Sequence, residues 1–130
     1  MEDLINSLYK RIPFYSTLGM EIKDIGNGRA SFEIVIREEL TQNGMVHGGV
    51  IASLIDSSCA CAAYSLVYPN GYITTIDLQI QYLKPASKGC LYAKAKCIKR
   101  GKFIYFCKAK VWNDEEQLIS TGSSQLLRMS

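Results

Sequence analysis

One long apolar segment, residues 48–68, constrains the fold of this chain more than any other feature. Its residues are apolar or small with a single charged exception, Asp56. A run of this length, followed by the turn sequence Pro69-Asn70-Gly71, predicts a helix over about residues 48–67. Asp56, several serines and the lack of a flanking Lys/Arg cluster disfavour a transmembrane helix. We therefore expect a central helix that the rest of the chain must cover.

The charge within this helix and the residues at its start together indicate a reactive site. A lone carboxylate in a buried segment is costly unless it is paired, hydrogen-bonded or used in chemistry. Gly48 and Gly49 follow His47, the only histidine, and mark a helix start whose free N–H groups can bind an oxyanion. These groups on one helix suggest chemistry on a carbonyl. Two alternatives stay open: a purely structural Asp56, and a His47 that makes only a local polar contact.

The remaining segments predict an α+β architecture in which about five to six antiparallel strands wrap around the central helix. Residues 2–12 carry a helical stripe of apolar side chains, which Pro13 is expected to end. The whole chain, residues 1–130, is expected to form one domain. Strands are expected at residues 19–25, 29–37, 72–83, 91–99, 103–112 and 117–127, with a loop at residues 38–46.

Alternation in the strand at residues 72–83 sorts its side chains onto two opposite faces. One face is expected to carry Ile76, Leu78, Ile80 and Tyr82, and the other Thr75, Asp77, Gln79 and Gln81. The sheet would also have two edge strands with unpaired backbone groups. Pairing of edges across a two-fold axis hides such groups, so we expect a homodimer.

Composition and charge exclude several other classes of protein. The formal net charge is only +3 and no basic run exceeds Lys99-Arg100, so no nucleic-acid partner is expected. Residues 2–12 are charged and amphipathic rather than a signal peptide, so we expect a cytoplasmic protein with no membrane association. The five cysteines are odd in number and lack zinc-ligand spacing, so neither disulfides nor a metal is expected. A Cys–His nucleophile pair stays open.

Three motifs in this order resemble the hotdog-fold acyl-CoA thioesterases, specifically the phenylacetate-pathway (PaaI-like) branch. The resemblance covers about residues 15–127. The first motif, G-x-x-H-G-G-x-x-x-x-L-x-D, is present as Gly44, His47, Gly48, Gly49, Leu54 and Asp56. The second comprises Thr75, Asp77, Tyr82 and Lys84-Pro85-Ala86, and the third is the hairpin turn Arg100-Gly101-Lys102.

The resemblance implies a hotdog fold and hydrolysis of an acyl-CoA thioester to a carboxylic acid and coenzyme A, without a cofactor. It implies that the Gly48 amide, with Gly49, polarises the thioester carbonyl and that Asp56 acts as nucleophile or general base. His47 would lie beside the carbonyl, and Thr75 would lie near the carboxylate and its water.

The resemblance also implies contacts to the coenzyme A moiety. Lys84, Arg100 and Lys102 would contact its phosphates, although the last two also fit an ordinary solvated turn. Some relatives hold the catalytic water with an Asn six residues before the HGG histidine, where this chain has Thr41. Gln42 or Asn43 would have to take that role through a shift of the loop.

The spacing of Gly48 and Asp56 sets a condition on the assembly. Eight residues of helix separate them by about 12 Å, too far for one carbonyl to reach both. If both act, they come from different subunits, and a dimer has two equivalent sites. The resemblance further implies pairing of dimers into a homotetramer. The rival functions are a non-catalytic acyl-CoA sensor and a hotdog hydratase or dehydratase, and the acyl group is not readable from the sequence.

Overall fold

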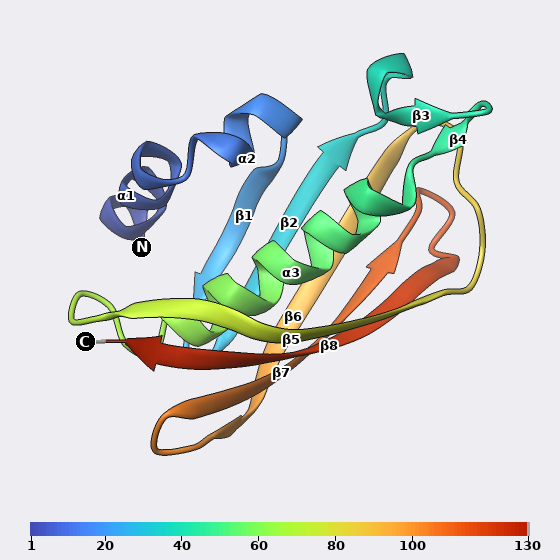
Figure 1. Ribbon diagram of the computed structural model, residues 1–130. Helices are drawn as coiled ribbons and strands as arrows, with labels where there is room; N and C mark the ends of the chain where they lie inside the picture. The colour runs from blue at the N-terminus through green and yellow to red at the C-terminus, as the bar shows by residue number, and fades with distance from the viewer. Residues whose placement is uncertain (130) are drawn as a thin grey trace.

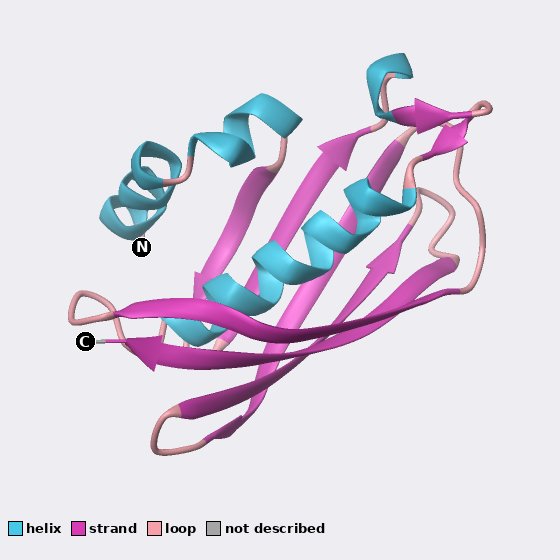
Figure 2. Cartoon of the chain, viewed as in Figure 1, coloured by secondary structure: helices cyan, strands magenta, loops and turns pink. Residues whose placement is uncertain are grey.

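The central helix α3 (Gly48–Tyr64) lies against one face of a single six-stranded antiparallel sheet. This arrangement is seen in a computed structural model that describes residues 1–129 (Figure 1). The sheet curves around the helix (Figure 2), which confirms the predicted α+β architecture. The strands in spatial order are β1 (Glu21–Gly26), β2 (Arg29–Val35), β6 (Cys90–Arg100), β7 (Ile104–Trp112), β8 (Leu118–Met129) and β5 (Tyr72–Tyr82).

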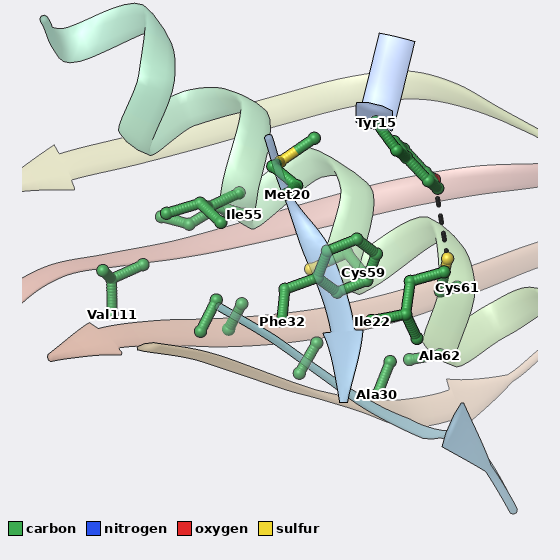
Figure 3. Close-up of a cluster of buried hydrophobic side chains, with 14 of the residues drawn as sticks. Tyr15, Met20, Ile22, Ala30, Phe32, Ile55, Cys59, Cys61, Ala62 and Val111 are labelled. Carbon is green, nitrogen blue, oxygen red and sulfur yellow. Dashed lines mark hydrogen bonds between the residues drawn. The ribbon is translucent and has the colours of Figure 1, made fainter. Parts of the chain in front are cut away.

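Small side chains on the inner face of the sheet allow α3 to approach it closely. Ala95, Ala109 and Gly122 lie side by side on β6, β7 and β8. A Cβ added at Gly122 would come within 2.7 Å of Cγ2 of Ile55 on the helix. Figure 3 shows Ile55 in the buried cluster between the helix and the sheet. The apolar side chains of α3 therefore pack against the sheet, and this contact fixes the position of the helix.

Helix α3 ends at Tyr64, three residues before the predicted end. The hydroxyl of Ser65 donates to the Ala62 carbonyl at 2.7 Å and accepts the Gly28 N–H at 2.9 Å. A serine that bonds to the backbone in this way competes with the regular helical ladder. The next N–H groups, those of Leu66 and Val67, bond to carbonyls only three residues back, and the chain turns away.

The N-terminal region forms two helices instead of the single predicted one. Helix α1 (Glu2–Arg11) ends just before Pro13, as expected, but α2 (Pro13–Leu18) begins at that proline. Proline suits the first turn of a helix because its missing N–H would have no partner there. Helix α2 buries Tyr15, whose hydroxyl lies 3.5 Å from Sγ of Cys61 (Figure 3).

Strand β5 contains a bulge that the alternation pattern did not reveal. The register with β8 shifts between Thr75 and Asp77, and Ile76 is 53% exposed. Thr75 faces the helix, and after the bulge Leu78 and Ile80 pack against the core as well. The prediction that separated Thr75 from Leu78 and grouped Leu78 with Ile76 is therefore wrong. One inserted residue reverses the faces of a strand, since side chains alternate with a period of two.

The predicted loop at residues 38–46 contains a short 3₁₀ turn, η1 (Glu38–Leu40), and a two-stranded hairpin. The hairpin pairs β3 (Thr41–Gln42) with β4 (Met45–Val46). Its turn is Asn43-Gly44, and both residues have positive φ angles, 55° and 79°. This is the pattern of a two-residue hairpin turn, which Asn-Gly favours. The His47 N–H donates to the Leu40 carbonyl at 2.8 Å. This bond fixes His47 at the start of α3, directly after the hairpin.

Candidate active site

The Gly48 N–H, at the start of α3, is a backbone donor without a partner among the described residues. The Gly49 N–H donates to Nδ1 of His47 at 2.8 Å, and the Val50 N–H donates to the His47 carbonyl at 2.9 Å. Within residues 1–129, no acceptor lies within hydrogen-bond distance of the Gly48 N–H. The first turn of a helix has four such donors and a partial positive charge. Gly48 is thus the free donor at this helix start, and Gly49 is engaged by the cap.

The cap also defines the hydrogen-bonding state of His47. Because Nδ1 accepts a hydrogen bond, it carries no proton in this arrangement. The neutral imidazole then has its proton on Nε2, which can only donate. The side chain of His47 is exposed beside the helix start. His47 is therefore suited to donate a hydrogen bond to an oxygen atom and unsuited to act as a base through Nδ1.

Tyr82, at the end of β5, is a neighbour of the helix start that the motif did not assign to the site. Its hydroxyl donates to the Gly48 carbonyl at 2.7 Å. A Cβ added at Gly48 would lie 3.3 Å from the Tyr82 ring. Gly48 therefore leaves room for this ring, and Tyr82 fixes the end of β5 to the first residue of α3. The presence of Tyr82 in the second motif was the only signal for this role in the sequence.

Asp56 lies in the middle of α3 and is paired with Thr75. Oγ1 of Thr75 donates to Oδ1 of Asp56 at 2.7 Å, and both side chains are half-buried. The bulge at Ile76 turns Thr75 toward the helix and makes this contact possible. Within residues 1–129, no donor is found for Oδ2 of Asp56. One oxygen is thus held in place, and the other is available to a water or a substrate.

The structure does not bring Gly48 and Asp56 together within one chain. Both lie on the same straight helix, about 12 Å apart at 1.5 Å per residue. The residues of α3 that the sheet does not bury form one stripe along the helix. This stripe comprises Gly48, Gly49, Ala52, Ser53, Asp56 and Ala60. Asp56 is its only charged member, and the other five residues are small.

The three basic residues of the predicted coenzyme A contact do not form one cluster. Lys84 follows β5, near the start of α3, where Tyr82 is bonded to Gly48. Arg100 lies past the opposite end of the helix, where Nη2 donates to the Leu66 carbonyl at 3.1 Å. Arg100 also donates through Nε to the Tyr105 hydroxyl at 3.2 Å. Arg100 is therefore partly used in holding the fold, whereas Lys84 is exposed and free to bind an anion.

Lys102, the third of these residues, lies beyond Arg100 in the turn between β6 and β7. Its ammonium lies 5.4 Å from the centre of the Phe103 ring. In the loop before α3, the Thr41 hydroxyl donates to the Glu38 carbonyl at 2.7 Å. Asn43 occupies the exposed hairpin tip, and Gln42 is exposed beside it. Asn43 thus has a clear role in the turn, and its proposed role in holding water stays a prediction.

The cysteines offer no activated nucleophile at this site. Burial raises the pKa of the Cys59 and Cys61 thiols to about 12, so both stay protonated near neutral pH. His47 lies at the start of α3, about 18 Å along the helix from Cys59. Cys107 is also buried, and its pKa is raised for the same reason. No Cys–His pair of the kind considered above forms between these residues.

The described part of the chain gives no sign of a metal centre or of a membrane-crossing helix. Within residues 1–129, no three side chains of the His, Cys, Asp or Glu type are grouped to hold a metal ion. No helix in the same range has both the length and the apolar character needed to cross a bilayer.

Comparison with known proteins agrees with this fold. Residues 43–120 match the sequence profile of the family described as the thioesterase superfamily. A protein of Halobacterium salinarum, provisionally named an esterase, is 34% identical over 107 residues, covering 78% of this chain and 70% of its own. The 1,4-dihydroxy-2-naphthoyl-CoA hydrolase of Listeria monocytogenes is 25% identical over 104 residues, covering 79% and 85%.

A solved structure of a thioesterase family protein from Silicibacter pomeroyi superposes with a TM-score of 0.90. It is 26% identical, and the match covers 98% of this chain and 97% of that one. The chain therefore belongs to the thioesterase superfamily, as the motifs indicated. It is an enzyme of the thioester hydrolase class.

Proposed function

We propose that this protein is an acyl-CoA thioesterase of the PaaI-like type, whose active sites are shared between the subunits of a homodimer. The observation that carries the proposal is the Asp56–Thr75 pair, with one carboxylate oxygen held at 2.7 Å and the other free. A free backbone donor, the Gly48 N–H, supplies the complementary group. The name of the Listeria relative, a CoA hydrolase, supports coenzyme A as the leaving group.

In the proposed reaction, the carbonyl oxygen of the thioester accepts a hydrogen bond from the Gly48 N–H at the positive end of α3. Asp56 takes a proton from a water molecule, and the water oxygen bonds to the carbonyl carbon. The tetrahedral intermediate then expels the coenzyme A sulfur, which takes up the proton. Asp56 acting as the nucleophile itself, through an anhydride that water then opens, is consistent with the same geometry. His47 donates through Nε2 beside the carbonyl.

The proposed assembly is supported by the edge of the sheet that β5 forms. Four large apolar side chains are exposed on this strand and just after it, namely Tyr72, Ile76, Tyr82 and Leu83. Pairing of two β5 edges about a two-fold axis would cover them and satisfy the unpaired backbone groups. The two α3 helices would then run antiparallel, with their small-residue stripes facing. Asp56 of one subunit would approach Gly48 of the partner subunit, and two dimers would form the homotetramer.

A sensor that binds acyl-CoA without cleaving it has less support than hydrolysis. A binding site gains nothing from a carboxylate next to the reactive carbon, and burying part of that charge is costly. The hydratase or dehydratase alternative needs a catalytic histidine paired with a carboxylate. His47, the only histidine, is bonded instead to the Gly49 N–H. Release of coenzyme A from acyl-CoA esters separates the hydrolase from both alternatives.

The shared site is tested by a heterodimer of two inactive variants. Asp56→Asn removes the base, and Gly48→Val blocks the oxyanion donor, so each homodimer should be nearly inactive. The variants carry different affinity tags, are coexpressed, and the doubly tagged heterodimer is purified. One of its two sites contains both defects and the other contains neither, so its turnover should reach about half that of the wild-type dimer.

The control is a doubly tagged heterodimer of Asp56→Asn with the wild-type chain, which should also retain about one intact site in two. A Gly48/Asp56 heterodimer as inactive as its parents, with the control active, would show that the two groups act within one chain or that Asp56 is not catalytic. Gly48→Ala, whose smaller Cβ faces the Tyr82 ring at 3.3 Å, checks that the loss with valine is not misfolding.

A further inference from the structure

The outer face of the sheet, turned away from α3, carries a dense group of positive charges. Lys94 on β6 lies directly opposite Lys110 on β7, and Lys96 lies opposite Lys108. Arg29 on β2 is the neighbour of Lys96 on its other side. All five side chains are exposed. Like charges placed directly opposite each other destabilise a sheet, so this arrangement has a cost for folding.

Acidic side chains lie at one end of this face, where Glu33 and residues 114–116 line a second hollow with Lys94 and Trp112, but none of them is paired with the five cations. Across residues 1–129, the ion pairs within 4.0 Å all involve Lys23, and none involves the five cations of the outer face. The two cross-strand rows continue onto β8 with Thr121 and Ser123, which are neutral hydrogen-bonding residues. One third of the 15 Lys and Arg residues of the chain thus lie on this face.

The same face is hollowed, and an aromatic residue is among those that line the hollow. The hollow has a volume of about 470 Å³, which is within the usual range for small-molecule sites. Its lining includes the five cations, Thr121, Ser123 and Trp112. Trp112 is the only tryptophan of the chain and is half-buried two residues beyond Lys110 on β7. Cations, hydroxyl donors and a half-buried aromatic side chain thus line the same hollow.

We propose that this hollow binds a free nucleoside di- or triphosphate, separately from the thioester site. The phosphates would lie between the lysines of the two rows. Adjacent strands are about 4.8 Å apart, so two ammonium groups can reach the same phosphate. The base would stack on Trp112, as bases do on aromatic side chains in general.

Other occupants fit the face less well. A second copy of this chain would place five cations against five, which opposes association. Asp56 and Thr75 lie on the helix side of the sheet, whereas the hollow lies on the other side. A nucleotide that is still part of a substrate bound at Asp56 would therefore have the sheet between its two ends. A free nucleotide has no such constraint.

The test uses the wild-type protein at low ionic strength, with binding measured by titration calorimetry and by the fluorescence of Trp112. ATP and ADP should bind saturably and change the fluorescence. Sodium triphosphate should compete with them but change the fluorescence little, because it has no base. The double variant Lys94→Gln/Lys110→Gln should weaken ATP binding at least about tenfold, since two charge-assisted contacts are lost. Thioesterase activity should be unchanged.

The matched control is Lys10→Gln/Lys88→Gln, which removes two exposed lysines outside the hollow and should leave ATP binding within about twofold. Equal weakening in both double variants would mean diffuse surface charge and would overturn the proposal. Binding of free coenzyme A without binding of ATP or ADP would assign the hollow to the substrate and overturn it too. Binding of an acidic polypeptide such as polyglutamate, but of no nucleotide, would do the same.

The proposal also has a readout that does not depend on a ligand. Removing two of the opposed cations relieves like-charge repulsion, so Lys94→Gln/Lys110→Gln should melt at a higher temperature than the wild type at low salt. The difference should vanish at high salt, and the control pair should show no such gain. A melting temperature that falls at low salt would mean that these lysines stabilise the sheet and are not retained for binding.

Discussion

The start of helix α3 and its middle each carry one half of the proposed site, but the chain builds the two halves by different means. At the start, the reacting group is the backbone N–H of Gly48. The next two N–H groups, those of Gly49 and Val50, are bonded to the side chain and the carbonyl of His47. In the middle, the reacting group is the Asp56 side chain, held by Thr75. A mutation can block the backbone N–H of Gly48 but cannot delete it, whereas a mutation can remove the Asp56 carboxylate itself.

This difference determines what each half contributes. A helix start binds negative charge wherever it develops and needs little else from the sequence. A carboxylate that acts on a water molecule needs its position and its charge maintained by a neighbour. Apart from a change that blocks the Gly48 N–H, such as Gly48→Val, we therefore expect substitutions in the middle of α3 to reduce turnover most. Substitutions around the helix start that leave this N–H open should affect binding and stability more evenly.

The largest effect is expected for Asp56→Asn. This change keeps the shape of the side chain and removes the base, so kcat should fall at least about 10²-fold while KM changes little. Steady-state release of coenzyme A from a panel of acyl-CoA esters measures both constants. Asp3→Asn, on the exposed first turn of α1, is the control and should behave as wild type. Turnover near the wild-type level in Asp56→Asn would return Asp56 to a structural role.

A smaller effect in the same direction is expected for Thr75. Thr75→Ala removes a hydrogen bond to a charged group, a contact worth about 1.5–3 kcal/mol, so kcat should fall about tenfold or more. Thr75→Ser keeps Oγ and should recover most of the activity. Measuring kcat for both variants over a pH series tests whether the hydroxyl acts through the carboxylate. Equal activity of the alanine and serine variants would remove Thr75 from the site.

The sequence predicts those features of the site that depend on residues close together in the chain, and it misses those that depend on distant residues. The HGG motif and the apolar run place Gly48 and Asp56 on one helix directly, because a helix is defined by residues close in sequence. The contact between Thr75 and Asp56 depends on a bulge in β5, and that bulge reflects pairing with β8 about fifty residues later. The alternation of residues 72–83 contains no signal of it.

The same reasoning explains the other differences from prediction. The early end of α3 depends on Ser65, whose hydroxyl meets the Gly28 N–H from a distant turn. The separation of Lys84 from Arg100 depends on where two strands end relative to the helix, which the sequence spacing does not specify. Helix α2 could have been predicted, because Pro13 is as typical of a first helical turn as of a helix end.

A moderate effect is expected for the basic residues at the two ends of α3. Lys84 and Lys102 are exposed, and neither forms an ion pair or a side-chain hydrogen bond within residues 1–129. Lys84→Gln and Lys102→Gln should each raise KM for acyl-CoA about 2- to 5-fold with kcat unchanged, as for solvent-exposed charge contacts. The salt dependence of KM should weaken in parallel.

The comparison of these two variants also shows which end of the helix the coenzyme A phosphates occupy. Lys10→Gln, at an exposed position on α1, controls for the loss of one charge. If neither Lys84→Gln nor Lys102→Gln alters KM or its salt dependence, these residues are only solvated turns. Arg100 is a poorer choice for this experiment, because its bonds to Leu66 and Tyr105 would also be lost.

The smallest effect is expected at His47, where a cap and a proposed contact to the carbonyl can be separated. His47→Ala removes the acceptor of the Gly49 N–H and should cost about 1 kcal/mol of stability, as for other N-caps. This corresponds to a fall of about 4 °C in the melting temperature.

Asn is a strong N-cap residue, so His47→Asn should restore the melting temperature. It lacks Nε2, however, and should turn over substrate as slowly as the alanine variant, since both have lost the proposed contact to the carbonyl. Thermal unfolding and kcat, measured on both variants, would separate the two roles; full activity in His47→Asn would limit His47 to capping the helix.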